Sequence, residues 1–500
     1  MHCAKMTYRI SWFKPGFQTR LAITCNCFQA FFLFGYDQGV FGGLISNPSF
    51  LDVVGHPSSA FLGFIVSSYN LGCFSGCGLN FIIGSRWGRK HALWLALFLV
   101  IMGAVLQSSA YSVPQLITGR IITGLGVGID TSTIPTYQAE LCKPHVRGRL
   151  VTTEVSFACL GVAFAYFFAY GINFAGGEIA WRLPIAIQIV PAIIISIVLF
   201  GLPETPRWLM EQGRIDEAVA VMCHVYGVSS DDYQIQEEKT AIIHALEIES
   251  ADPFRWTNVF KKDRLHTGRR VILAILALSA NQLAGINVIV VYIATVLETN
   301  IGLSRDQALI GGGGINFAFV VGSLVPALGI DRIGRRKPMV IGAIGMALSL
   351  LAISVLLSYK GTDKEKATAN AAVGFFVLYQ LCFGASLNGV PWCYGAEILP
   401  LKARVKGTSL AVLANWVWVF IIVEVTPILI DRLQWRMYLI FMTTNILMAL
   451  MIYFLFPETS RLSLEEIDMI FVTDDDPLSL PQDVSEKSSQ SKASDGRVLV

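Results

Sequence analysis

The sequence has little charge. Asp, Glu, Lys and Arg make up 15% of its 500 residues, whereas soluble domains carry about 25%. The net charge of +2 offers no strongly basic surface for nucleic acid. Its ten cysteines include no CxxC pair or disulfide framework, and no metal cluster, nucleotide loop or nucleophile–base arrangement stands out. We therefore expect neither an enzyme nor a cofactor. Hydrophobic residues reach 54% and the mean hydropathy is +0.57, which indicates a polytopic membrane protein.

Twelve apolar runs follow one another along the chain, and each is close to or above the length that crosses a bilayer as a helix. They cover residues 21–46, 59–83, 92–110, 115–139, 150–174, 183–202, 271–297, 308–330, 338–358, 371–396, 407–430 and 436–456. Glycine and proline interrupt many of them, which membrane helices tolerate when their neighbours satisfy the freed backbone groups. The pattern predicts an all-α integral membrane protein with twelve transmembrane helices.

Short charged motifs recur at an offset of about 250 residues. SRWGRK at Ser85 returns as DRIGRR at Asp331, and PETPR at Pro203 returns as PETSR at Pro457, an offset of 457 − 203 = 254. Parallel repeats of this kind are typical of transporters that are built from two similar halves. We therefore predict two pseudo-symmetric six-helix bundles, at residues 21–202 and 271–456.

The segments outside these bundles are polar. Residues 203–270 contain EQGRIDEAVAVMCHVYG, whose apolar residues have helical spacing, so we expect a linker of short amphipathic helices. Residues 1–20 form an N-terminal segment, and residues 457–500 form a tail that we expect to be largely disordered after 473. Short loops on the side of the termini carry more lysine and arginine than those on the other side. This bias predicts cytosolic termini, and we expect the plasma membrane.

Asp37 is the only charged residue in the first apolar run. A carboxylate in hydrocarbon is costly unless it has a partner or a task. Arg120, in the run at 115–139, comes to a comparable depth when the helical rise is counted from the outer end of each helix. The two residues are expected to meet in the outer half of the membrane. They form either a structural ion pair or a proton-accepting carboxylate that the cation tunes.

Two further acids, Asp130 and Glu154, stand in or beside apolar runs. We expect Glu154 to belong to the cytosolic charge cluster. For Asp130 we favour a solvated residue in the inner cavity over a second proton site or a substrate contact.

Amide side chains mark the run at 271–297. Asn281 and Gln282 lie about ten residues past the basic residues that open this run, and therefore near the midplane. Neutral amides donate and accept hydrogen bonds, as sugar hydroxyls do, without the cost of a buried charge. Tyr292 shares a helical stripe with Asn281, whereas Asn287 would join them only through a local break at Gly285. The alternative is that these groups merely bind neighbouring helices together.

Several motifs together resemble the sugar porter family of the major facilitator superfamily, from about Phe34 to Ile470. They are FGYDQGV, GRIITGLGVG, PETPRWL, NQLAGIN, DRIGRRKP, GVPW with AEILP, and PETSRLSLEEID. The stretches FGYDQGVFGG and TSTIPTYQAE are most similar to fungal members, which include hexose, pentose, glycerol and sugar-acid carriers. The resemblance implies that Asp37 couples transport to protons and that Arg120 is its partner.

The resemblance also implies a substrate site between the two halves. Its residues are Asn281, Gln282, Asn287 and Tyr292 in the first helix of the second half, with Asn316, Trp392, Asn415 and Trp416 from later helices. Asn281 and Val291 stand where the family usually has Gln and Tyr. This departure puts hexose in doubt and leaves a pentose, a smaller polyol or a sugar acid open.

Arginine and acid residues in the repeated motifs resemble the family's cytosolic gate, whose ion pairs lock the inner side in the outward-open state. They are Arg89, Glu140, Arg147 and Glu204 in the first half, and Arg335, Glu397, Arg404 and Glu458 in the second. Ser85 replaces the acid that Asp331 provides in the second half. We therefore predict a weaker latch in the first half.

These observations together predict a monomeric transporter in the lipid bilayer. It would move a sugar, polyol or sugar acid by alternating access, with protons coupled through Asp37. Two alternatives stay open: a facilitative uniporter with a structural Asp37–Arg120 pair, and a sensor that binds sugar without moving it.

Overall fold

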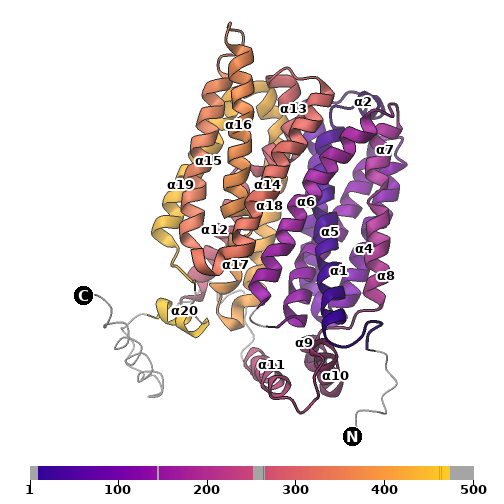
Figure 1. Ribbon diagram of the computed structural model, residues 1–500, viewed down its shortest axis with the longest axis vertical. Helices are drawn as coiled ribbons and strands as arrows, with labels where there is room; N and C mark the ends of the chain where they lie inside the picture. The colour runs from indigo at the N-terminus through magenta and orange to yellow at the C-terminus, as the bar shows by residue number, and fades with distance from the viewer. Residues whose placement is uncertain are drawn as a thin grey trace, which may run out of the picture.

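A computed structural model describes residues 10–143, 146–251, 263, 265–460, 462 and 464–472. Within these residues the protein is a bundle of long helices (Figure 1). The first half consists of α1 (Phe17–Leu44), the short α2 (Pro48–Val54), α3 (Ser59–Trp87), α4 (Arg89–Ser108), α5 (Val113–Leu141), α6 (Arg147–Asn173), and α7 (Ile179–Ala186) followed by α8 (Ile189–Phe200).

The second half repeats this arrangement. It consists of α12 (Thr267–Leu283) followed by α13 (Ile286–Asn300), α14 (Arg305–Ile333), α15 (Arg336–Leu357), α16 (Glu365–Phe383) continued by the π-helix η3 (Gly384–Asn388) and α17 (Val390–Glu397), α18 (Leu401–Leu433), the 3₁₀ turn η4 (Gln434–Arg436), and α19 (Met437–Leu455).

Nine helical stretches of the described chain are long and apolar enough to cross a membrane. One of them, Lys402–Leu455, contains two helices, α18 and α19, so the nine stretches give ten crossings. The remaining two are α1 and α5, which have 28 and 29 residues and are less apolar because they carry glycines and charged side chains. The prediction of twelve transmembrane helices is thereby confirmed.

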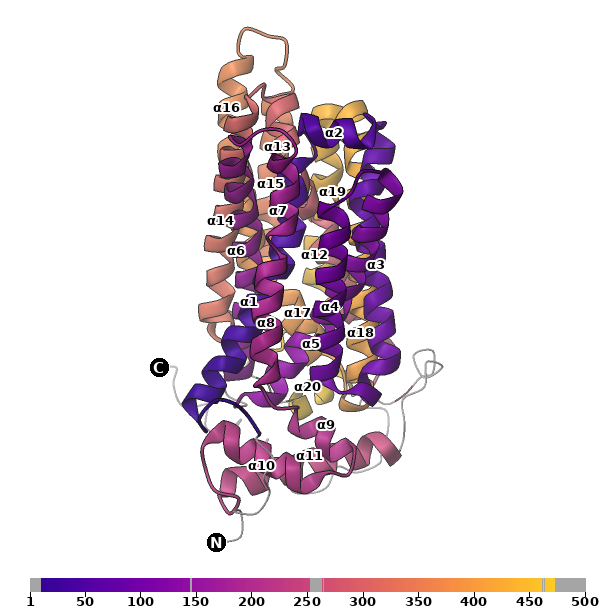
Figure 2. The same cartoon turned by 90° about the vertical axis from the view of Figure 1, so that its right-hand side faces the viewer.

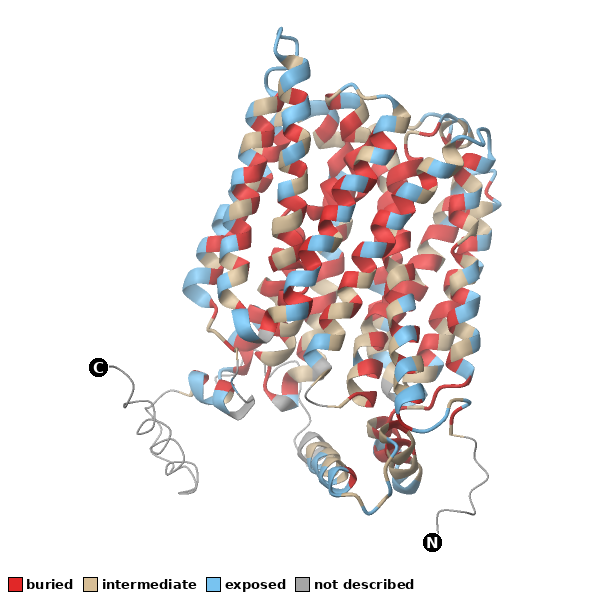
Figure 3. Cartoon of the chain, in the orientation of Figure 1, coloured by how far each residue is buried: buried red, intermediate tan, exposed pale blue. Residues whose placement is uncertain are grey.

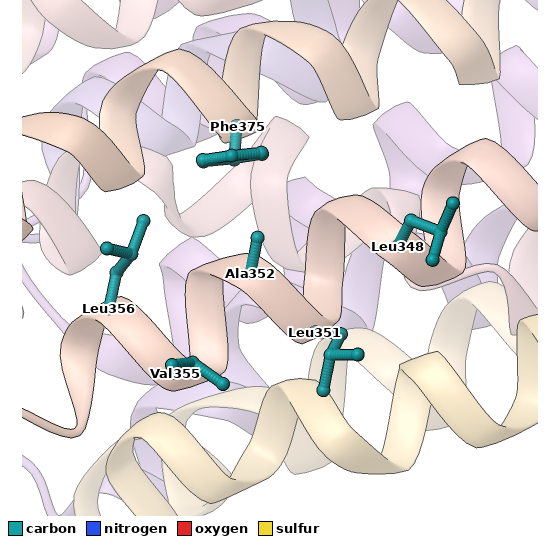
Figure 4. Close-up of a pocket in the computed structure, with 6 residues that line it drawn as sticks. All are labelled: Leu348, Leu351, Ala352, Val355, Leu356 and Phe375. Atoms are coloured by element: carbon teal, nitrogen blue, oxygen red, sulfur yellow. The ribbon is translucent and has the colours of Figure 1, made fainter.

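The outer surface of the bundle is apolar, unlike that of a soluble protein. Figure 3 shows buried residues where helices face one another and exposed ones around the perimeter, and the exposed residues include large apolar side chains such as Leu328, at 77% exposure, and Phe454, at 74%. A groove on the outer surface of the second half, between α15 and α16, is lined by apolar side chains alone: Leu348, Leu351, Ala352, Val355, Leu356 and Phe375 (Figure 4). Such a surface suits lipid chains and offers nothing to a hydroxylated ligand.

The linker helices and the start of α1 lie at one end of the bundle, which we call the terminal end (Figures 1 and 2). The linker contains α9 (Pro206–Glu211), α10 (Ile215–Tyr226) and α11 (Tyr233–Ala251), as the helical spacing predicts. The helix α20 (Leu464–Phe471) lies at the same end and is held by the fully buried Arg270. The Arg270 guanidinium donates to Ile398 O at 2.5 Å and to the Asp468 carboxylate at 2.5 Å. The opposite end of the bundle, which carries α2, is the far end.

Two glycines explain how the helices of the site are shaped. Gly35 lets α1 and α6 approach closely, because a Cβ at this position would overlap the backbone of Ala158. Gly285 has φ +91° and ends α12 before α13 begins, and a Cβ there would meet the ring of Phe441 at 2.7 Å. The predicted break at Gly285 is confirmed, and it places the two segments of this crossing around a common point.

Candidate functional site

Four amide side chains form one hydrogen-bonded cluster around the break at Gly285. The Gln282 amide donates to Asn281 Oδ1 at 2.7 Å and to Asn415 Oδ1 of α18 at 3.0 Å. Asn287, beyond the break on α13, donates to Gln282 Oε1 at 2.6 Å. All four residues are buried, and Gln282 is their hub. The structure therefore brings Asn281, Gln282, Asn287 and Asn415 together, as a common site requires.

The cluster can exchange its internal hydrogen bonds for bonds to a ligand. Each amide offers both donors and an acceptor, so a hydroxyl that enters can replace a neighbouring amide without leaving a polar group unsatisfied. Asn281 also donates to the carbonyls of Leu387 and Asn388, at 2.6 and 3.1 Å, in the distorted η3 region. This arrangement joins three separate crossings through neutral groups.

The aromatic residues of the predicted site take different positions. Tyr292 donates to Val423 O on α18 at 2.9 Å, so its hydroxyl is engaged with backbone and not with the amides. Trp416 meets Phe34 of α1 edge to face, with ring centroids 6.0 Å apart, and so lies between the two halves. Trp392, on α17, is partly buried against the apolar core. The Trp416 ring of the second half thus contacts the first half through Phe34 of α1.

Asn316 belongs to a separate polar pair. It donates to Gly312 O at 3.0 Å within α14 and accepts a hydrogen bond from Gln380 of α16 at 3.0 Å. Both side chains are fully buried. The hydrogen bonds that join Asn281 and Asn415 in one cluster do not extend to Asn316, so its assignment to the substrate site stays a prediction. Gln380 had no marking feature in the sequence beyond being an amide in an apolar run.

The Asp37–Arg120 pair differs from the expected ion pair. Both side chains are buried, and they interact electrostatically, but no nitrogen–oxygen contact of 4.0 Å or less joins them. Arg120 instead donates to Val66 O of α3 at 2.5 Å, and its guanidinium carbon lies 3.7 Å from the centre of the Phe41 ring. Phe41 is one turn beyond Asp37 on α1, so it offers the cation an aromatic face in place of the carboxylate.

Asp37 has a neighbour that the sequence did not reveal. The side chain of Gln188, at the start of α8, interacts with the Asp37 carboxyl group, whereas Asp37 Oδ2 is buried without a hydrogen-bond partner. Gln188 lies in an apolar run with no motif around it. The neutral amide of Gln188 thus lies close to the carboxyl group, while Arg120 binds Val66 O.

Arg89 forms the ion pairs of the latch at the terminal end of the first half, with Glu140 and, at 3.8 Å, with Glu211 of α9. Arg89 Nη2 lies 3.0 Å from Glu140 Oε1. Glu204 accepts hydrogen bonds from the backbone N–H groups of Arg89 and Lys90, at 3.2 and 3.0 Å, and so caps the start of α4. Burial raises the pKa of Glu204, and hydrogen bonds from the backbone N–H groups of Thr205 and Lys90 oppose the rise. The side chain of Arg147 lies outside the described residues.

The second half repeats this pattern with more hydrogen bonds. Arg335 binds Glu397 through two contacts, at 2.7 and 3.1 Å. Glu458 accepts from the backbone N–H groups of Arg335 and Arg336, at 2.9 and 3.0 Å. Arg404 donates to Leu399 O at 3.3 Å. Glu204 and Glu458 therefore accept hydrogen bonds from backbone N–H groups at the starts of helices, whereas the sequence suggested that they pair with arginine side chains. The Arg335–Glu397 pair has two hydrogen bonds, and the Arg89–Glu140 pair has one.

A polar cluster at the far end was not anticipated. Arg305, at the start of α14, donates to Asn173 Oδ1 at 2.9 Å, to Ser46 Oγ at 2.7 Å and to Gly43 O at 2.8 Å. Ser46 in turn donates to Glu298 of α13 at 3.0 Å. Two halves meet here, because Gly43, Ser46 and Asn173 belong to the first and Arg305 and Glu298 to the second.

A second contact between the halves involves an acid inside the run at 407–430. Glu424 of α18 accepts a hydrogen bond from Ser67 of α3. Ser67 directly follows Val66, whose carbonyl binds Arg120. The sequence feature that could have pointed to Glu424 is an acidic residue within an apolar run.

A bundle of twelve crossings in two similar halves, with a polar cluster between them, defines a membrane transporter of the major facilitator type. The family model described as "Sugar (and other) transporter" matches residues 22–471. The MFS-type transporter oryC of Aspergillus oryzae is 36% identical over 452 residues, covering 89% of this chain and 84% of the relative. The sugar transporter STL1 of Saccharomyces cerevisiae is 33% identical, covering 92% and 82%.

Solved structures agree with this assignment. The proton:xylose symporter XylE, bound to 6-bromo-6-deoxy-D-glucose, has a TM-score of 0.78 and 25% identity, covering 91% of this chain and 99% of that one. XylE comes from E. coli. The chain therefore belongs to the sugar porter family of the major facilitator superfamily. It is a multi-pass membrane transporter and not an enzyme.

Proposed function

We propose that the protein moves a neutral, hydroxyl-rich substrate across the membrane by alternating access, together with protons. The observation that carries the proposal is the amide cluster centred on Gln282. It joins α12, α13 and α18 through hydrogen bonds that a sugar or polyol can replace one for one. The four amides bear no charge, which favours a sugar or polyol over a sugar acid.

Proton coupling rests on Asp37. Its carboxyl group is buried, has an oxygen without a hydrogen-bond partner, and lies near Arg120 without pairing to it directly. A proton can neutralise such a group, and Arg120 can move between Val66 O and the ionised carboxylate as the proton leaves. The name of XylE as a proton:xylose symporter supports the same assignment.

The cellular arrangement is part of this proposal. We place the protein in the plasma membrane as a monomer, with the terminal end and both chain termini in the cytosol. The excess of lysine and arginine in the loops of the terminal end supports this orientation.

Radiolabelled uptake in transporter-null yeast tests the proposal. Glucose, xylose, glycerol and galacturonate are each supplied with and without a protonophore, to cells that express the wild type or Asp37→Asn. Asp52→Asn is the matched control, because Asp52 is an exposed aspartate on α2. We expect one substrate to accumulate, and the protonophore and Asp37→Asn to abolish its accumulation while Asp52→Asn does not.

The other outcomes identify the alternatives. Uptake that survives both the protonophore and Asp37→Asn defines a facilitative uniporter. Binding of a sugar by purified protein without uptake of any substrate defines a sensor.

A further inference from the structure

The π-helix η3 ends against the first half of the protein. Gly389, which directly follows η3, faces α6, because a Cβ at this position would lie 3.8 Å from Thr152 Cγ2. Asn388, the last residue of η3, is buried, and its amide donates to the Cys159 thiol of α6 at 3.3 Å. A side chain of the second half therefore contacts the first half at this point.

Asn388 also contacts the amide cluster. Asn281 donates to Leu387 O at 2.6 Å and to Asn388 O at 3.1 Å. Leu387 O lacks its α-helical donor, because the residue four positions later is Pro391, which has no N–H group. Asn281 takes the place of that donor and so holds the end of η3 beside the cluster. Short π-helical segments of this kind are frequent at functional sites.

The hydrogen bond between Asn388 and Cys159 is a weak one. A thiol sulfur is a poorer acceptor than a hydroxyl or carbonyl oxygen. Residues 150–172 of α6 contain neither Asn nor Gln, so this helix offers Asn388 no amide oxygen. A substrate hydroxyl that lies between η3 and α6 is therefore a stronger acceptor than the group that it replaces.

We propose that Asn388 determines substrate specificity: its amide donates to one hydroxyl of the bound sugar or polyol, and it leaves the Cys159 thiol when it does so. The inference deepens the proposed function and rests on the amide cluster being the substrate site. Asn281 and Gln282 then hold the substrate from α12, and Asn388 holds it from η3. Because Asn388 also contacts α6, substrate binding changes a contact between the two halves.

Binding of monodeoxy analogues tests the proposal. Tracer binding to the purified protein in lipid nanodiscs is measured with glucose, xylose and glycerol, and the one that binds is then compared with each analogue that lacks one of its hydroxyls. We expect the wild type to bind at least one analogue about tenfold more weakly than the parent compound. Asn388→Ala should bind the parent about tenfold more weakly and should no longer distinguish it from that analogue. A residue that only supports the fold would weaken the parent and all analogues alike.

Cys159→Ala should change binding in the opposite direction. This variant removes the internal acceptor that the substrate displaces, so the parent compound should bind about two- to fivefold more tightly. Cys25→Ala, at an exposed cysteine of α1, is the matched control and should bind as the wild type does.

A preference among the analogues that Asn388→Ala retains in full overturns the proposal, and so does equal weakening by Asn388→Ala and Cys159→Ala. If Asn388→Ala does not yield folded protein, Cys159→Ala decides, because unchanged or weaker binding shows that the thiol does not compete with the substrate. Failure of the proposed function is distinguishable from these outcomes, since the wild type then binds none of the three parent compounds.

Discussion

Replacing Arg305 with glutamine should release the far end of the transporter. The guanidinium makes three hydrogen bonds, to Asn173, Ser46 and Gly43, all of which lie in the other half. A charged hydrogen bond contributes about 1.5–3 kcal/mol when buried. Arg305 is only partly buried, so we take roughly 1 kcal/mol for each contact. Opening the far end breaks all three contacts in the wild type.

The loss of roughly 2–3 kcal/mol corresponds to a shift of about 30- to 150-fold toward the state with an open far end. Electron–electron double resonance can measure this shift between spin labels at His56 and Thr362, exposed positions in the two halves, in a cysteine-depleted background. Arg305→Gln should lengthen the distances, whereas Arg432→Gln, at an exposed arginine of the second half, should not. Distances that stay the same in Arg305→Gln would refute the assignment of this cluster as a latch.

Three further predictions concern the site and the scaffold. Gln282→Ala removes the hub of the amide cluster and should weaken substrate binding at least about tenfold in a tracer binding assay; equal binding would separate the cluster from the substrate. Gly35→Leu should lower the melting temperature by several degrees, since a side chain cannot fit there, while Gly171→Ala, which has open space, should not. Arg335→Gln should lower it more than Arg89→Gln, because Arg335 makes two hydrogen bonds to Glu397, whereas Arg89 makes one to Glu140 and a longer contact, at 3.8 Å, with the exposed Glu211 side chain; the reverse order would contradict this ranking.

The fold followed from the sequence because its determinants are local. Runs of apolar residues define the crossings, and motif repeats define the two halves. The amide cluster could also be predicted in part from the sequence. Asn281 and Gln282 are adjacent, and Gly285 supplied the reason why Asn287 could join them. Asn415 was predicted from the family resemblance.

The contacts that the sequence did not reveal depend on how helices are rotated about their axes. Depth alone placed Asp37 beside Arg120, but rotation and packing turned the cation toward Phe41 and Val66. Gln188 reached Asp37 from another helix with no motif to mark it. Helical rise gives a residue's height in the bundle, and only packing decides which of its neighbours it meets.

The far-end cluster could not be predicted from the sequence for a different reason. Arg305 and its partners come from four separate helix ends, and each is an ordinary residue in its own segment. The position of Glu154 was misjudged for a related reason. Proximity in sequence to basic residues suggested a solvated cluster, whereas the helix that carries Glu154 turns it inward.

Substrate-driven proton movement tests the central claim most directly. Purified protein in proteoliposomes, with a gradient of the substrate identified by uptake and no initial proton gradient, is monitored with a pH-sensitive dye. We expect addition of the substrate to alkalinise the external medium in the wild type and in Asp52→Asn but not in Asp37→Asn. Substrate entry into the wild-type vesicles without any change in pH would contradict coupling through Asp37.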